Sequence, residues 1–190
     1  MLSVVIPTLN SERVLVPTLA MLVPGAMSGL VREVIIADAG SNDETLAVAD
    51  VAGCTVLSSS EALAVRLRAA AAAARGPWLM FLRAGAVLDT TWIDETTHFI
   101  EESDRSDGSA AVFRRAVSAR ASYPALREVF GLLIFGVFGR TSPDQGLVIS
   151  RRLYDELGGH RDAANDPEAD LLARLGRRRV LMLRSGMRNA

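Results

Sequence analysis

Lysine is missing from this chain, and all 21 basic side chains are arginine. We interpret this absence, beside so much alanine, as a composition bias and not as a device for phosphate recognition. Against 22 acidic residues the arginines leave a formal net charge of −1, so no overall positive field recruits nucleic acid. The single cysteine, Cys54, excludes an intramolecular disulfide, fits a reducing cytoplasm, and lies in an apolar setting that indicates a buried strand position.

Long apolar runs are also missing. No stretch reaches the roughly 18 apolar residues that a membrane-spanning helix needs. The nearest, 129–138, predicts a buried helix or strand, with a membrane-facing or lipid-acceptor patch as the alternative because it contains three phenylalanines. The chain begins directly with an apolar strand pattern, without a basic and apolar leader. We therefore expect no signal peptide and a cytoplasmic location.

Several common catalytic motifs are absent. The sequence contains neither G-x-G-x-x-G nor G-x-x-x-x-G-K-[ST], so it gives little support for a dinucleotide dehydrogenase or a P-loop enzyme. Without G-x-S-x-G, and with no histidine near a candidate nucleophile, a hydrolase triad has no basis. His98 and His160 each lack a second metal-type residue at ligand spacing, so we expect both to have packing or surface roles.

The length of 190 residues and a hydrophobic content of 49% predict one compact domain, 1–190. Strands alternate with helices, which predicts an α/β fold with a mostly parallel sheet. The polar segment 101–108 is the best candidate for a surface loop. We expect strands at 2–7, 32–37, 54–58, 78–82, 109–117 and 146–150, and helices at 11–23, 43–51, 61–75, 91–103, 123–138, 151–157 and 168–175.

The most informative segment is 34–45, VIIADAGSNDET, in which a buried strand pattern ends in Asp38 and passes into a glycine turn. Ser41 and Glu44 have capping-box spacing, which predicts free N–H groups of a helix start close to the carboxylate. Such a loop suits a nucleotide. The alternative is that Asp38 and Ser41 only cap a turn.

The opening segment 3–10, SVVIPTLN, repeats this pattern, and Asn10 is placed to cap the following helix. Together the two segments resemble the nucleotide-binding half of family 2 glycosyltransferases, with a strand ending in P-T/x-N and then a D-x-G-S-x-D-x-T loop. The resemblance implies a GT-A-like fold and a UDP- or GDP-sugar donor. It implies that Asp38 contacts the base of the nucleotide, and the other implied nucleotide-binding residues are Pro7, Thr8, Asn10, Gly40 and Ser41.

The segment 141–159 resembles the acceptor side of the same family, in a small bacterial branch with P-x-x-D-Q-G before a strand and L-G-G after a helix. This implies a nucleotide-binding half at 1–103, an acceptor half at 104–190, and acceptor contacts from Asp144 and Gln145. The branch continues with M-E-D-x-[DE]-L, whose central acid is the base of inverting transfer. Aligning 167–171, PEADL, puts Glu168 at that position, with Asp170 as the other candidate. The plain alternative is that both acids are solvated residues of a helix first turn.

The family places an acidic D-x-D or H-A-D motif, which holds a divalent cation against the diphosphate, where this chain has 81–86, FLRAGA. Gly85 replaces the acid and Arg83 stands at the other flank, so dependence on Mg²⁺ or Mn²⁺ becomes doubtful. Arg83 could pair the diphosphate directly, with Arg66 and Arg68 as the nearest other cations. Alternatively Arg83 is a solvated residue of a decayed site.

The resemblance implies an inverting glycosyltransferase that moves a sugar from a nucleotide-diphospho-sugar to an acceptor hydroxyl. A second hypothesis is a catalytically impaired relative that binds a nucleotide or a protein partner without turnover. The arginine run 177–179 predicts a solvated turn, or contact with an anionic acceptor or lipid head group. The residue patterns predict neither the donor sugar nor the oligomeric state.

Overall fold

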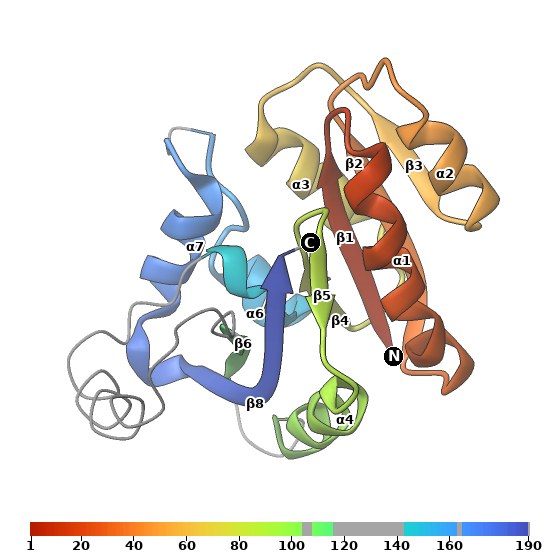
Figure 1. Cartoon of the computed structure of the whole chain (residues 1–190). Coiled ribbons are helices and arrows are strands. Elements are labelled where there is room, and N and C mark those ends of the chain that lie inside the picture. Colours follow the sequence, from red (N-terminus) through yellow and green to blue (C-terminus); the bar gives the residue numbers. More distant parts are fainter. Residues whose placement is uncertain (104–107, 116–142, 163–164, 190) are drawn as a thin grey trace, which may run out of the picture.

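The structure is a computed structural model of the chain, and it describes residues 1–103, 108–115, 143–162 and 165–189. Within these ranges one mixed sheet of eight strands runs through the protein in the order β3-β2-β1-β4-β7-β6-β8-β5 (Figure 1). The predicted α/β fold is confirmed. The strands are β1 Leu2–Thr8, β2 Val31–Asp38, β3 Thr55–Ser58, β4 Trp78–Phe81, β5 Ala86–Leu88, β6 Ala110–Arg115, β7 Leu147–Ser150 and β8 Val180–Asn189.

The first half of the sheet is parallel, because β1 pairs with β2 and β4, and β2 pairs with β3, all in the same direction. The second half is mixed. Strand β7 is antiparallel to β4 and β6, β6 is parallel to β8, and β8 is antiparallel to β5. The sequence predicts a mostly parallel sheet, and the half formed by β3, β2, β1 and β4 is parallel throughout.

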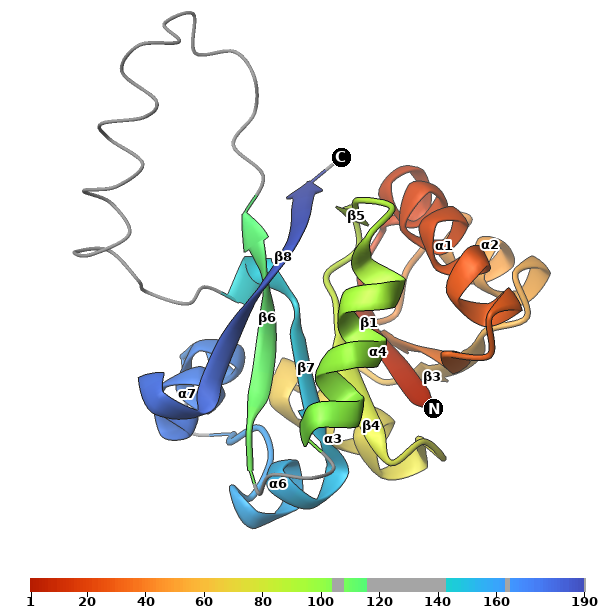
Figure 2. The same cartoon turned by 90° about the horizontal axis from the view of Figure 1, so that it is seen from below.

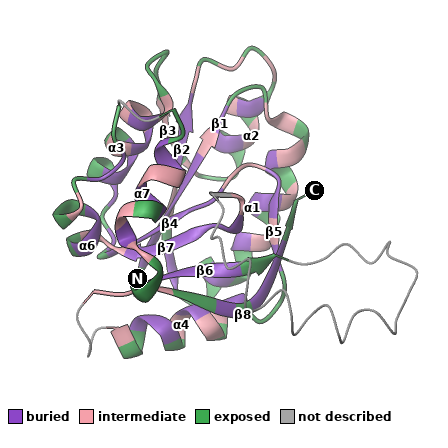
Figure 3. Ribbon diagram, turned by 90° about the vertical axis from the view of Figure 1, so that its left-hand side faces the viewer, coloured by how far each residue is buried: buried purple, intermediate pink, exposed green. Residues whose placement is uncertain are grey.

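Helices cover both faces of the sheet. Alternate residues of the central strands enter two apolar clusters, one under α1, α2 and α4 and the other under α3, α6 and α7. Figure 2 shows α1 and α2 side by side and well away from α6 and α7, and Figure 3 shows how fully the central strands are buried. The helices are α1 Glu12–Met27, α2 Thr45–Val51, α3 Leu63–Ala73, α4 Trp92–Ser103, α6 Arg151–Glu156 and α7 Pro167–Leu175, with short 3₁₀ helices at Pro143–Gln145 and Arg177–Arg179.

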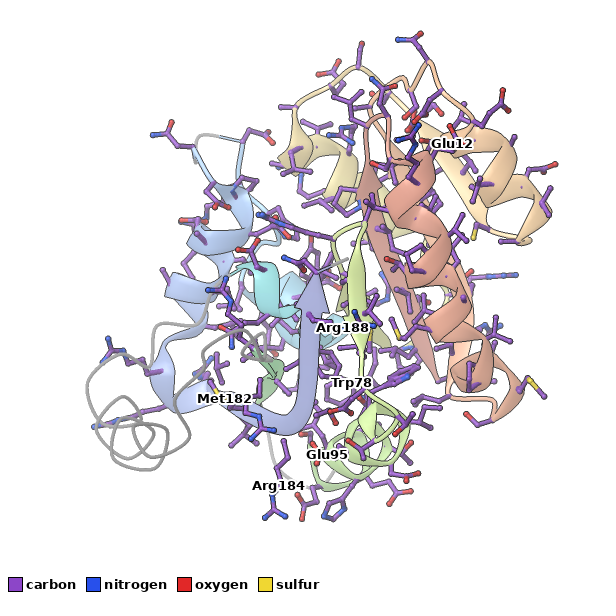
Figure 4. All side chains as sticks on the ribbon, in the orientation of Figure 1. Glu12, Trp78, Glu95, Met182, Arg184 and Arg188 are labelled. Carbon is purple, nitrogen blue, oxygen red and sulfur yellow. The ribbon has the colours of Figure 1, made fainter. Side chains whose placement is uncertain are left out.

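Two strands, β5 and β8, were not predicted. Strand β8 contains Arg184, Ser185 and Gly186, which break the apolar alternation that marks a strand. Side chains from outside the strand fix its backbone. Glu95 of α4 accepts hydrogen bonds from the N–H groups of Arg184 at 2.6 Å and Ser185 at 2.9 Å (Figure 4 labels Glu95 and Arg184), and Asp89 accepts one from Gly186.

Some other expectations need correction, and some concern segments outside the described residues. The loop predicted at 101–108 begins later, because residues 101–103 belong to α4, and 104–107 lie outside the described residues. The predicted helix 123–138 and the apolar run 129–138 also lie outside them, as do the last residues of the predicted strand 109–117. Each helix within the described ranges falls short of the length and apolarity that a membrane crossing requires.

Candidate functional site

The carboxyl ends of β1, β2 and β4 meet at one edge of the sheet, because these parallel strands are neighbours. Thr8 and Asp38 are the last residues of β1 and β2 and face each other in the register. Arg83 follows shortly after the end of β4. The side chains singled out in three separate sequence segments therefore lie along the edge at which ligands collect in open α/β sheets.

The Asp38 carboxylate is fully buried and is satisfied inside the protein. Its Oδ1 accepts hydrogen bonds from the hydroxyls of Thr8 at 2.8 Å and Ser41 at 2.5 Å. Its Oδ2 accepts from the N–H groups of Gly40 at 2.7 Å and Ser41 at 2.8 Å. Burial would raise the pKa of Asp38, but these donors outweigh it and lower the pKa, so the group is ionised. Since a carboxylate offers about four acceptor positions, Asp38 uses all of its capacity to shape the loop.

The predicted helix caps are wrong at both loops. Helix α2 begins at Thr45, so Ser41 lies before it and forms no capping box with Glu44. Helix α1 begins after Ser11, and Asn10 does not cap it. Instead Asn10, with a left-handed φ of 49°, ties the two loops together: its N–H donates to Ser41 Oγ at 2.9 Å and its Oδ1 accepts from the N–H of Asn42 at 2.8 Å.

Two arginines of α3 were named as further cations, and only one reaches this edge. The Arg66 guanidinium donates from Nη1 to the carbonyl oxygen of Ala37 at 2.5 Å. Burial lowers the pKa of Arg66 and the charge of nearby Asp38 counteracts this. Arg68 turns elsewhere, with Nη1 donating to a carboxylate oxygen of Asp162 at 2.5 Å and to the carbonyl oxygen of His160 at 2.7 Å. Arg66 is therefore the cation of α3 that lies near Asp38 at the end of β2.

Arg83 joins the two halves of the chain through carboxylates. Its Nη2 lies 2.6 Å and its Nε 3.0 Å from Glu168 Oε2, and its Nη1 lies 2.7 Å from Asp144 Oδ1. Arg115 Nη2 contacts the other oxygen of Asp144 at 3.1 Å. The Arg83 side chain is 42% exposed, whereas that of Glu168 is 9% exposed. Glu168 is consequently a nearly buried carboxylate whose counter-charge remains accessible from solvent.

The start of α7 places Glu168. Asp166 is the N-cap of α7, and its Oδ1 accepts hydrogen bonds from the N–H groups of Glu168 at 3.1 Å and Ala169 at 3.0 Å. Burial raises the pKa of Glu168, and the hydrogen bonds and charge of Arg83 only partly offset it. Asp170 instead forms an ion pair with Arg174, one helical turn along α7. Of the two candidate bases, Glu168 is the one that faces Arg83.

The profile of Glycosyl transferase family 2 matches residues 3–181, which is nearly the whole chain. The chain belongs to this family. No curated protein sequence matches it. Among solved structures, glucosyl-3-phosphoglycerate synthase from Mycobacterium tuberculosis, in complex with Mn²⁺, UDP and glucosyl-3-phosphoglycerate, superposes with a TM-score of 0.70 at 21% identity. That match covers 100% of this chain and 72% of that one.

A second similar structure is S. aureus TarS 1–349, also solved with UDP, for which the TM-score is 0.70 at 16% identity. It covers 96% of this chain and 57% of that one. These likenesses confirm the predicted GT-A fold.

The segment 81–86, where the resemblance implies a cation motif, contains no acidic side chain. Gly85 has a φ of 94°, a left-handed conformation that an aspartate would adopt only with strain, and its N–H donates to Thr18 Oγ1 at 2.9 Å. Among the described residues, no group of three or more His, Cys, Asp or Glu side chains is placed to hold a metal ion. The residues present at this position do not fit the divalent cation that the family resemblance implies.

Other expected site residues have internal contacts. Gln145 is 5% exposed and its Nε2 donates to the carbonyl oxygen of Phe113 at 3.0 Å, which anchors the 143–145 turn to β6. Pro7 is partly exposed beside Thr8 at the end of β1. Sequence reasoning missed Arg115 and Thr18, since neither lies in a recognisable motif. Their roles depend on strand pairing and helix packing, which bring distant segments together.

The remaining polar residues have structural or surface positions. His160 is buried, with Nδ1 2.8 Å from the Tyr154 hydroxyl, so it has a packing role. His98 is an exposed residue of α4 and has a surface role. Both positions agree with the expectation for the two histidines. Cys54 is only half-buried and precedes β3, a position less buried than predicted. The exposed run 177–179 forms the expected turn.

Proposed function

We propose that this chain transfers a sugar from a UDP- or GDP-sugar to an acceptor hydroxyl with inversion of configuration. The observation that carries the proposal is the nearly buried Glu168, held by Arg83 at the same sheet edge as the loop around Asp38. A carboxylate of raised pKa beside a nucleotide loop suits a general base. The family membership and the UDP-bound TarS and glucosyl-3-phosphoglycerate synthase structures support the donor class.

The donor would bind over the two loops that Asn10 and Ser41 tie together. Asp38 acts by holding the Thr8 hydroxyl and the Gly40 and Ser41 N–H groups in place, so the nucleotide meets a preformed surface. A direct contact between Asp38 and the base would have to replace one of these hydrogen bonds. Pro7 forms the adjoining wall at the end of β1, as the resemblance implies.

Arg83 would bind the diphosphate in place of a metal ion. A diphosphate carries about two negative charges, and burying them without a counter-charge costs several kcal/mol. In the protein alone the Arg83 guanidinium is held by Glu168 and Asp144. An arriving diphosphate competes with these carboxylates for its N–H groups. As Arg83 turns toward the diphosphate, Glu168 loses part of its counter-charge, its pKa rises further, and it becomes a stronger base.

The transfer step follows from this placement. Glu168 accepts the proton of the acceptor hydroxyl while the hydroxyl oxygen attacks the anomeric carbon from the face opposite the diphosphate. The bond between the anomeric carbon and the diphosphate oxygen breaks, and its electron pair leaves with the nucleoside diphosphate. Arg83, Arg66 and the loop N–H groups stabilise that charge. One domain, 1–190, performs the reaction, with donor contacts from 1–103 and acceptor contacts, including Asp144, from 104–190.

The second candidate is a relative that binds a nucleotide or a protein partner without turnover. It is favoured by Gly85 in the place of the acid and by the two carboxylates that already engage Arg83. Calorimetry with UDP and GDP, first in EDTA and then in Mn²⁺, tests the donor site. Binding in EDTA that Arg83→Gln weakens and Mn²⁺ strengthens by less than about tenfold supports the proposal. A larger gain with Mn²⁺, or unchanged affinity in Arg83→Gln, contradicts it.

A further inference from the structure

Asp43 and Thr45, the last two polar residues of the 34–45 motif, form a small hydrogen-bonded unit at the start of α2. Thr45 is the first residue of α2 and is fully buried, and Asp43 is partly exposed. The hydroxyl and the N–H of Thr45 both donate to Asp43 Oδ1, at 2.5 Å and 3.1 Å. The hydrogen bond from the hydroxyl is the main cause of a lowered pKa of Asp43, so the carboxylate is ionised. Asp43 Oδ2 and the Thr45 hydroxyl oxygen can each accept a further hydrogen bond.

Helix α1 begins without a side-chain cap of its own, because the hydroxyl of its N-cap, Ser11, is bonded to the backbone of Leu9 instead. The N–H groups at a helix start have no partner within the helix and need an outside acceptor. The N–H of Ser11 donates to Thr45 Oγ1 at 2.7 Å. The N–H of Glu12, which Figure 4 labels at the start of α1, donates to Asp43 Oδ2 at 3.2 Å. The loop after β2 thus caps the helix that follows β1.

This cap is the outer end of a row of hydrogen bonds between the two loops. Nearest the sheet, the N–H of Ala39 donates to the carbonyl oxygen of Thr8 at 2.9 Å. Further out, Asn10 is bonded to Ser41 and Asn42 of the opposite loop. The left-handed φ of Asn10 is a conformation that persists in a residue other than glycine only where the surroundings fix it. The cap supplies part of that fixation, because it holds the chain directly after Asn10.

We propose that Asp43 and Thr45 are positioning residues of the donor site. They cap α1 across the loops and so hold the segment 8–11 against the segment 38–42 before a nucleotide arrives. The helix dipole favours an ionised carboxylate at the start of α1, which strengthens this link. A loop that is already ordered loses less freedom on binding, so the cap should increase nucleotide affinity without touching the nucleotide. The inference rests on the proposed function for its ligand, whereas the cap can be measured in the protein alone.

Calorimetry with UDP and GDP tests the role of the hydroxyl. Thr45→Val removes it with little change in shape and should weaken binding of the nucleotide about three- to tenfold, the range for one hydrogen bond. Thr45→Ser keeps the hydroxyl and should bind within about twofold of the wild type. Thr97→Val is the matched control, because the Thr97 hydroxyl bonds the carbonyl oxygen of Ile93 within α4, far from the start of α1 (Figure 1). This control should bind like the wild type.

Two results in these titrations contradict a positioning role. One is equal affinity in Thr45→Val and the wild type, and the other is a Thr45→Ser variant as weak as Thr45→Val, since the hydroxyl would then not be the group that matters. Circular dichroism establishes that each variant is folded. Asp43→Ala removes a partly exposed carboxylate and repeats the test if the buried position 45 does not tolerate valine.

Amide hydrogen exchange followed by NMR tests the cap without a ligand. In Thr45→Val the N–H groups of Asn10 and Ser11 should exchange about threefold faster or more than in the wild type, while those of β1 and β2 keep their rates. Unchanged exchange at Ser11 overturns the cap, whether or not a nucleotide binds. A wild type that binds neither UDP nor GDP contradicts the proposed function, and the positioning role with it, so the two failures are distinguishable.

Discussion

Replacing Arg83 by glutamine should destabilise the protein by leaving the Glu168 carboxylate without its counter-charge. The two side chains meet through two N–H donors on one oxygen, at 2.6 Å and 3.0 Å. Removing one partner of a fully buried pair costs about 3–5 kcal/mol. Here Glu168 is 9% and Arg83 42% exposed, so water screens the pair partially. We therefore expect a loss of about 1–3 kcal/mol in the free energy of unfolding at neutral pH.

Lowering the pH should reduce this loss of stability in Arg83→Gln. Burial raises the pKa of Glu168 with Arg83 present, and removing Arg83 raises it further, so Glu168 in the variant accepts a proton at a higher pH than in the wild type. Once it is protonated, the carboxyl group is neutral and no longer needs the guanidinium. The difference in stability between Arg83→Gln and wild type should therefore shrink as the pH falls toward the usual titration range of a glutamate.

Urea unfolding of wild type, Arg83→Gln, Glu168→Gln and the double variant, at neutral and mildly acidic pH, measures these effects. The double variant should be more stable than Arg83→Gln at neutral pH, because the buried charge is gone, and the cycle should give a coupling of about 1 kcal/mol or more. A coupling near zero, or a cost of Arg83→Gln that does not change with pH, would refute the argument that Arg83 is the counter-charge of Glu168.

Three further changes follow from the structure. Asp38→Ala should weaken UDP or GDP binding by about 1–3 kcal/mol by calorimetry and also lower stability, because its buried donors lose their acceptor; unchanged affinity in a folded variant removes Asp38 from the site. The pKa of His160 is lowered to about 4, chiefly by burial. The unfolded chain therefore binds more protons, and stability should fall by up to about 3 kcal/mol from pH about 6.5 to about 4; His160→Gln should flatten this slope in urea titrations, whereas His98→Gln should not. Gly25→Ala should lower the free energy of unfolding by about 1–3 kcal/mol, and the melting temperature with it, since a Cβ would lie 2.5 Å from Trp92 Cη2; an unchanged melting temperature would show that Trp92 moves freely.

The parallel half of the fold could be predicted because its signals are local. Apolar runs that end at Thr8 and Asp38 mark strands buried on both faces. The motifs that carry the family resemblance follow directly at the ends of these runs. The second half could not be predicted as well. Strand β8 is polar at Arg184 and Ser185 and is held by Glu95, a contact between residues far apart in the sequence.

The site shows the same division. Asp38 was placed correctly at the end of a strand, but its four hydrogen bonds and the Asn10 link depend on how two loops meet. Capping rules assign Ser41 and Asn10 to the helices that follow them, whereas each binds the neighbouring loop instead. Arg83 could be recognised as a cation in the place of an acid. Its pairing with Glu168, 85 residues away, emerges only from the packing of α7 against α3 and the 143–145 turn.

The central claim is that Glu168 acts as the base of a transfer in which Arg83 replaces a metal ion. The most direct test follows the release of nucleoside diphosphate from a panel of UDP- and GDP-sugars, in EDTA, by wild type and Glu168→Gln. We predict release by the wild type that is slowed roughly 10²-fold or more in Glu168→Gln. Nucleotide affinity in this variant should be equal to or tighter than that of the wild type, because Glu168 no longer competes with the diphosphate for Arg83. Asp170→Asn, the matched control, should retain activity. Release that requires Mn²⁺, or that survives in Glu168→Gln and is lost in Asp170→Asn, would contradict the account.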